Sequence, residues 1–498
     1  MASEHDLPSS INNPSSGLPP GFPRITPSSP LRDFGPGSMD YERCAALHNE
    51  LLTKVVRALG GEMPSAPPSW WEARAPPDEV ANALNPSLIE FLKRAVDNSV
   101  MPTPGPLFVF IWALNLPEGF FQDEEYYSMY DEPGRFLKLY ESGYFRPEDN
   151  LGLLFDQETM KACYIEDLED TRMIANKEWS WMPLEVILDS YLQMIDEGKV
   201  EAVSKEQAAL LDRDPNIGVL EPWILHQYTK IDVERAATAF KRLTNAIEYR
   251  IAMQTRDNDK PKTQATLTAL PWHDPATYNT DILPSSSFSH EFLCAISDTK
   301  VSFRYIAPGI RFPTIPEFAD QPLTDFGPRP RSKLGRFPGN CPLHLFQVDT
   351  TEEKKHPMPY DRHLALDNLT PGFYIYRVVS SWHAVCSNEC HLILPFGIGR
   401  RGYARKSNGA PLGLTDCDHL EENPEPRDVF VGLYQTGLTN GITNNHSVTI
   451  DKVLDNWADR VENGDWEVDE HGVKGGIDKF READTAEHWH KYWIPPSW

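Results

Sequence analysis

The stretch that decides the fold is GFYIYRVVSSWHAVCSNECHLILPFGIGRRGY, residues 372–403. Its pattern indicates two strands joined by a polar turn and followed by a glycine-rich bend with cationic side chains. Both faces of the first strand are largely apolar, with Phe373 and Ile375 on one face and Tyr374 on the other. A strand that is apolar on both faces needs cover on both sides. We therefore expect this hairpin to lie inside a sheet and to form the core of the larger domain.

Length and charge limit the class of protein. The chain has 498 residues, more than one hydrophobic core normally supports, so two domains are expected. Its 73 acidic and 47 basic residues give a net charge of -26, which argues against broad binding to nucleic acid or to an anionic membrane surface. The longest apolar run, residues 107–116, is too short to cross a bilayer. The amino terminus has neither the basic start nor the apolar middle of a secretory signal, and seven thinly spread cysteines are typical of reduced thiols. The sequence thus predicts an acidic, soluble, cytoplasmic protein.

Changes in composition divide the chain into four segments, and together they predict an α+β fold. Residues 1–37 are rich in Pro and Ser, hold few large apolar groups and are expected to form an intrinsically disordered tail. Residues 38–254 carry apolar side chains at helical spacing and predict a mainly helical domain. The polar residues 255–265 are the expected linker. Residues 266–498 show short β-rich runs and predict a β-rich domain, a sandwich or half-barrel, closed by carboxyl-terminal helices.

Local signals mark several helices of the first domain. Ser38 or Asp40 caps a first helix, and Asn85 caps a second. Apolar stripes predict further helices over residues 181–198 and 232–253, the second being the longest in the chain.

One succession of elements carries a family resemblance. The strand-like run LGLLFDQETMKACYI, residues 151–165, precedes the helical run WMPLEVILDSYLQMIDEGK, residues 181–199. This succession resembles part of the small α+β modules that mediate protein interactions. The resemblance covers a few dozen residues and assigns no site residue.

Histidines are concentrated in the second domain, where 12 of the 15 lie from His273 onward. The densest group, H-x2-C-x3-C-H over residues 383–391, contains the ligand types that zinc prefers. Cys390 and His391 are adjacent, however, and adjacent side chains of an extended chain point to opposite faces. We therefore predict buried thiols and no metal site. His383 and His391 remain the candidate acid or base of a catalytic site.

The glycine-rich bend is the second candidate site. Residues 397–402 match the dinucleotide fingerprint G-x-G-x-x-G. Dinucleotide binding requires a helix directly after this motif, and the residues that follow do not favour one. Arg400, Arg401 and Arg405 stand beside flexible backbone amides, and together these groups suit an anion pocket for a carboxylate or phosphate. A second cationic run over residues 329–336 can join them if the fold brings both together. The alternative is that both runs only neutralise an acidic surface.

The carboxyl-terminal run EHWHKYW, residues 487–493, combines two histidines with three aromatic residues. On a helix His488 and His490 diverge, so an aromatic cluster that packs the carboxyl terminus is favoured over a metal site.

Two functional classes follow from these features. The first is an intracellular interaction, scaffolding or ligand-binding protein without a recognisable catalytic motif, whose partner is a protein or a small anionic ligand. The alternative is an enzyme acting on a small anionic metabolite, with His383 or His391 as acid or base and Arg400, Arg401 and Arg405 as the substrate clamp. Whether the chain is an enzyme, which cofactor it takes and its oligomeric state stay open.

Overall fold

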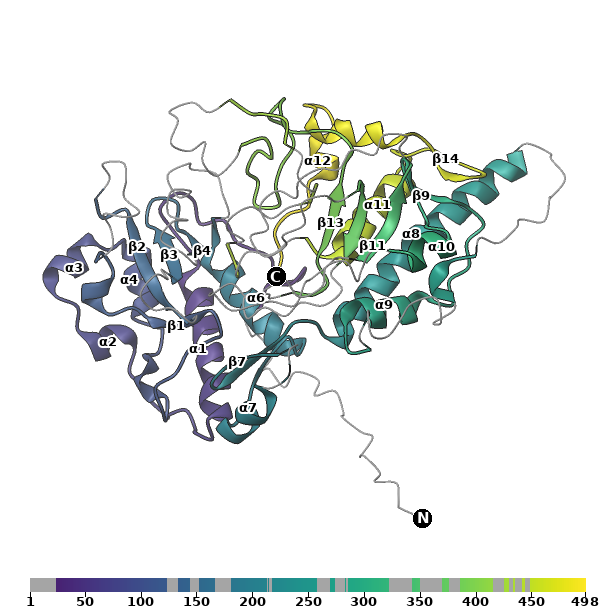
Figure 1. Cartoon of the computed structure of the whole chain (residues 1–498). Coiled ribbons are helices and arrows are strands. Elements are labelled where there is room, and N and C mark those ends of the chain that lie inside the picture. Colours follow the sequence, from purple (N-terminus) through teal and green to yellow (C-terminus); the bar gives the residue numbers. More distant parts are fainter. Residues whose placement is uncertain are drawn as a thin grey trace, which may run out of the picture.

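The computed structural model is an α+β structure that combines helices with antiparallel and mixed sheets (Figure 1). It describes residues 24–122, 133–143, 152–165, 181–212, 214, 217–257, 269–273, 283, 285–321, 343–349, 370–375, 386–414, 425–429, 433–434, 441–443 and 448–498. No helix within these ranges is long and apolar enough to cross a membrane.

A first hydrophobic core lies between helices α1 (Tyr41–Ala58) and α6 (Leu184–Asp196) and a five-stranded antiparallel sheet of order β1-β2-β3-β4-β5. The strands of this sheet are β1 (Ile111–Leu114), β2 (Phe136–Ser142), β3 (Gly152–Asp156), β4 (Lys161–Ile165) and β5 (Met182–Pro183). Of the two predicted caps, Ser38 and Asp40, it is Asp40 that caps α1, because its side chain accepts a hydrogen bond from the backbone N–H of Arg43 at 3.2 Å.

Shorter elements surround this core. They are the helices α2 (Trp70–Arg74), α3 (Asp78–Ala83), α4 (Pro86–Leu92) and α7 (Lys205–Leu211), and a three-stranded sheet of β6 (Val200–Ala202), β8 (Trp223–His226) and β7 (Ile217–Leu220). Asn85 caps α4 as predicted. Where the sequence predicts a mainly helical domain, the structure thus places two antiparallel sheets beside the helices, because strands this short leave little periodicity in the sequence.

A second core forms around the long helix α8 (Lys230–Asp257). Helix α8 packs along α11 (Ile450–Glu462), beside α9 (Phe288–Ile296), and against a seven-stranded sheet of order β13-β12-β11-β10-β9-β15-β14. Arg242 of α8 reinforces this contact through ion pairs with carboxylates of α11, including Asp459 at 2.6 Å. In the described residues this part of the chain holds one seven-stranded mixed sheet backed by helices, and the sandwich or half-barrel stays a prediction.

The hydrophobic clusters show which residues pack with which core. The apolar stripe of α8, from Val233 to Ile247, belongs to the second core, whereas Leu225 belongs to the first. The packing therefore divides between residues 225 and 233, and α8 is part of the second unit. Most of the predicted linker, residues 258–265, lies outside the described residues. Figure 1 shows the two units side by side, the first in purple to blue and the second in teal to yellow.

The predicted hairpin forms one end of the seven-stranded sheet, and its second strand is the outermost strand in the order. Strand β12 (Gly372–Ile375) pairs on one side with β11 (Leu343–Val348) and on the other with β13 (Cys390–Ile393), and every residue of β12 and β13 is buried. Phe373 and Ile375 enter the hydrophobic core, whereas Tyr374 lies outside that cluster. The expectation of a hairpin covered on both faces is confirmed. Its turn, residues 376–385, lies outside the described ranges.

The remaining described strands and helices lie around this sheet. They are β9 (Tyr305–Ala307), β10 (Ile310–Arg311), β14 (Val468–Asp469), β15 (Gly472–Val473), α10 (Ile315–Ala319), α12 (Trp489–Tyr492) and the 3-10 helices η1 (Asn98–Val100), η2 (Pro117–Gly119), η4 (Pro271–His273) and η7 (Ile477–Asp484).

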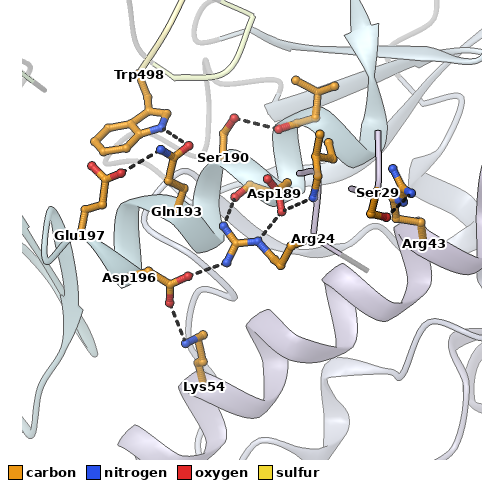
Figure 2. Close-up of polar contacts among 12 residues, drawn as sticks. Arg24, Ser29, Arg43, Lys54, Asp189, Ser190, Gln193, Asp196, Glu197 and Trp498 are labelled. Carbon is orange, nitrogen blue, oxygen red and sulfur yellow. Dashed lines mark hydrogen bonds and ion pairs between the residues drawn. The ribbon is translucent and has the colours of Figure 1, made fainter. Parts of the chain in front are cut away.

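Residues 24–37 belong to the predicted disordered tail, yet they lie against α1 and α6 (Figure 2). Arg43 of α1 donates hydrogen bonds to the Pro30 carbonyl and the Ser29 hydroxyl, at 3.0 and 3.1 Å. These contacts give the second half of the tail fixed partners, so the ordered chain begins before residue 38. Residues 1–23 lie outside the described ranges.

Replacing Gly372 with Ala should destabilise the second core, because a Cβ atom at residue 372 would lie 1.8 Å from Nε2 of His344. His344 is buried and stacks on Tyr374 with ring centroids 4.3 Å apart, so it has little room to move. We expect Gly372→Ala to lower the free energy of unfolding by about 1–3 kcal/mol in urea denaturation. The matched control is Gly218→Ala in β7, where the nearest atom to a new Cβ is 3.8 Å away. Equal losses in the two variants would contradict this packing.

Candidate ligand-binding site

The backbone amides of the glycine-rich bend bind a side-chain carboxylate of the same chain. Four N–H groups donate hydrogen bonds of 2.9–3.1 Å to the Asp484 carboxylate: Gly399, Arg401, Tyr403 and Ala404. Asp484 is the last residue of η7 and is only 5% exposed. Gly399 has a φ of +113°, a conformation that residues with a Cβ rarely adopt, so glycine is required where the bend wraps around this carboxylate. An external anion would have to displace Asp484 to reach these amides.

The structure gives the three predicted arginines different surroundings. Arg400 and Arg401 are exposed on the bend, and the backbone N–H of Arg400 donates to Asp428 at 3.3 Å. The guanidinium of Arg405 lies over the ring of Trp489, with Cζ 5.3 Å from the ring centroid, and donates to the Gly402 carbonyl. Arg405 therefore faces the carboxyl-terminal segment. The second cationic run, residues 329–336, lies outside the described ranges.

His391 lies inside the sheet. It is 7% exposed and pairs across β12 and β13 with Tyr374. Its neighbours Cys390 and Leu392 enter the second core, so alternation along the strand places His391 on the opposite face. His344 of β11, which the sequence analysis did not single out, stacks on Tyr374, and burial lowers the pKa of His344 to about 3. His383 lies outside the described residues.

The cysteines near His391 are buried thiols. Cys386 and Cys390 are at most 2% exposed, and burial raises the pKa of Cys386 to about 12. A protonated, buried thiol is a poor nucleophile and a poor metal ligand. Within the part of the chain that the structure describes, no group of three or more His, Cys, Asp or Glu side chains is placed to hold a metal ion.

A cavity of about 300 Å³ opens between β5 and the carboxyl-terminal segment. We call it the tryptophan cavity, and its lining consists of Trp181, Met182, Arg405, Asn408, Gly409, Trp489, Trp493 and Pro496. One wall comes from the first unit and the other from the bend and the carboxyl terminus. Of the predicted site residues, Arg405 lies in this wall.

Hydrogen bonds fix the aromatic wall of the cavity. The indole Nε1 of Trp493 donates to the carbonyls of Lys406 and Ser407 at 3.0 and 3.1 Å, and the Ser407 hydroxyl donates to the Ile494 carbonyl at 2.7 Å. The rings of Trp489 and Trp493 lie 6.2 Å apart. With the indole N–H of Trp493 already bonded, that ring has only its π faces and edges to offer a ligand.

A wider hollow of about 430 Å³ lies over the first unit, where Arg135, Gln157 and Glu158 line it. The Arg135 and Gln157 side chains that line it are already ion-paired or hydrogen-bonded within the protein. Arg135 pairs with Asp156 at 2.9 Å, and the side chain of Gln157 bonds the backbone at Asn85, Ala83 and Gly134. The tryptophan cavity is therefore the better candidate for a ligand.

Part of this site is predictable from the sequence, namely the aromatic cluster and the bend. The run EHWHKYW signals an aromatic cluster at the carboxyl terminus, and the bend signals an anion. Trp181 lies more than 200 residues earlier in the chain, and no local pattern connects it with Trp489.

The fold and the cavity together define an α+β protein with a tryptophan-lined candidate binding site between its two units. No protein-family model matches the chain, and no curated protein and no solved structure matches it.

Replacing Asp484 with Asn tests the internal anion. Asparagine keeps one acceptor oxygen but removes the charge and turns an NH2 group toward two backbone donors. Because unsatisfied buried amides are costly, we expect Asp484→Asn to lower the free energy of unfolding by at least about 2 kcal/mol in urea denaturation. Amide hydrogen exchange at Arg401 and Tyr403 should accelerate. Asp478→Asn in the same η7 is the control, since its side chain is 76% exposed and pairs only with Arg481 among the contacts of the described residues. An unchanged exchange rate in Asp484→Asn would contradict the internal anion.

Proposed function

We propose that the protein is an intracellular interaction protein that binds an extended, proline-rich peptide in the tryptophan cavity. The observation that carries this proposal is the convergence of three indole rings from two distant parts of the chain on one small cavity. Proline-rich segments dock in aromatic-lined grooves because their polyproline II conformation is preformed, and little conformational entropy is lost on binding.

The chemistry of the lining supports a peptide ligand. Proline rings pack against indole faces, which Trp181, Trp489 and Trp493 supply in this cavity. Arg405 adds a positive charge whose stacking on Trp489 also holds that ring in place. A volume of about 300 Å³ is at the lower end for small-molecule sites, which suits one or two side chains of a longer ligand.

The alternative function is an enzyme that acts on a small anionic metabolite through His383 or His391 and the three arginines. The row formed by His391, Tyr374 and His344 across three strands favours a polar site in the sheet. Against it, the amides of the bend are occupied by Asp484, and Arg405 stacks on Trp489. The interaction role therefore has the stronger support.

We also propose a cytoplasmic location, with two units in one acidic chain. The five cysteines within the described residues form no disulfide with one another, which is consistent with a reducing compartment.

Titration with a hexaproline peptide tests this function. We expect binding that quenches or shifts tryptophan fluorescence, and we expect Trp489→Ala to weaken it at least about tenfold, or about 1.4 kcal/mol. Trp112→Ala is the matched control, because Trp112 is an exposed tryptophan of β1, at 38%, and is not part of the cavity lining. It should leave the affinity within about twofold.

A Gly/Ser hexapeptide should not bind, since it lacks proline rings. If hexaproline fails to bind at millimolar concentration, or binds Trp489→Ala as well as the wild type, the proposed function is wrong.

A further inference from the structure

The amino-terminal segment is fastened to α6 at the point where the described chain begins. The guanidinium of Arg24 pairs with the carboxylates of Asp189 and Asp196, and Lys54 of α1 contacts Asp196 at 3.3 Å (Figure 2). The side chain of Arg24 is only 17% exposed. Two carboxylates two turns apart on one helix and a partly buried guanidinium form a specific anchor, stronger than a typical exposed ion pair.

The carboxyl-terminal segment reaches the same helix. The indole of Trp498 donates to the Gln193 side chain at 3.4 Å, and Gln193 lies one helical turn beyond Asp189 (Figure 2). Pro496, two residues before Trp498, lines the tryptophan cavity. The carboxyl-terminal segment thus contacts the helix that binds Arg24, through Trp498, and lines the cavity two residues earlier, at Pro496.

The residues that precede Arg24 have the composition of a ligand for this cavity. Residues 18–23 read LPPGFP, with two adjacent prolines, one phenylalanine and a third proline. In polyproline II conformation six residues span roughly 19 Å. Asp189 and Trp181 are separated along the chain by five helical steps and three extended steps. The distance between their Cα atoms is therefore at most roughly 18 Å. Residues 18–23 are therefore long enough to reach the cavity from their anchor.

Building on the proposed function, we propose that residues 18–23 bind in the tryptophan cavity of their own chain and compete there with proline-rich partners. Arg24 holds the segment beside its site, so the binding is intramolecular. A short flexible connection gives an effective concentration on the order of 1 mM. A segment with an intrinsic dissociation constant of about 0.1 mM would then weaken the apparent affinity for an external peptide about tenfold.

Hexaproline titrations of full-length variants test the competition. The double variant Pro19→Ala/Pro20→Ala should bind hexaproline about tenfold tighter than the wild type, since its own segment no longer competes. Arg24→Ala should give a smaller gain, because the segment keeps its prolines but loses its anchor. The matched control is Pro8→Ala/Pro14→Ala, which removes two prolines of the same tail outside the segment and should leave the affinity unchanged. The indole N–H resonances of Trp489 and Trp493 should also shift between the wild type and Pro19→Ala/Pro20→Ala without any added peptide.

The outcomes separate the two proposals. Equal hexaproline affinity in the wild type and in Pro19→Ala/Pro20→Ala, with unchanged indole resonances, overturns the intramolecular ligand but leaves the proposed function standing if Trp489→Ala still weakens binding at least about tenfold. Absence of hexaproline binding in every variant overturns the proposed function and this inference together.

Discussion

The Asp484 carboxylate is the interaction on which the candidate site depends. Buried amides without partners are costly. Asp484 satisfies four of them at once and so ties the bend to the end of η7. Trp489 and Trp493 follow within nine residues of Asp484, and Arg405 follows the bend directly. One carboxylate thus sets the position of the second unit's wall of the cavity.

The other wall depends on the contact between the two units. Segments of the second half of the chain reach into the first core: Cys386 and Ile442 belong to that hydrophobic cluster. The hydroxyl of Tyr191 on α6 donates to the Ile442 carbonyl at 2.7 Å, and the Tyr164 backbone N–H donates to the Gly441 carbonyl at 2.9 Å. These bonds join α6 and β4 of the first unit to residues 441–442, and β5 pairs with β4. The cavity therefore exists only when both units have folded.

The accuracy of the sequence predictions follows the range of the interactions involved. Asp40 and Asn85 were identified as caps because a cap acts on the residues directly after it. The buried hairpin was identified because alternation along one strand reveals both faces. An anion pocket was one of two interpretations of the bend, but its partner Asp484 lies some 80 residues further on, where nothing in the sequence marks it. The stripe of α8 was recognised from its spacing, but amphipathicity does not tell which core a helix joins, and in the structure this stripe packs in the second core.

An internal anion at the bend changes what the site can recognise. With its amides bonded to Asp484, the bend presents side chains only, and the nearest surface is made of indole faces with one guanidinium. Binding through such faces comes from buried apolar area and ring contacts, which salt hardly screens, whereas an arginine clamp on a small anion weakens with ionic strength. The chain as a whole carries a net charge of -26 and repels free anions at a distance. A ligand that docks by shape against the rings is thus better matched to this protein than one attracted by charge, and this favours the interaction role over an anion-processing enzyme.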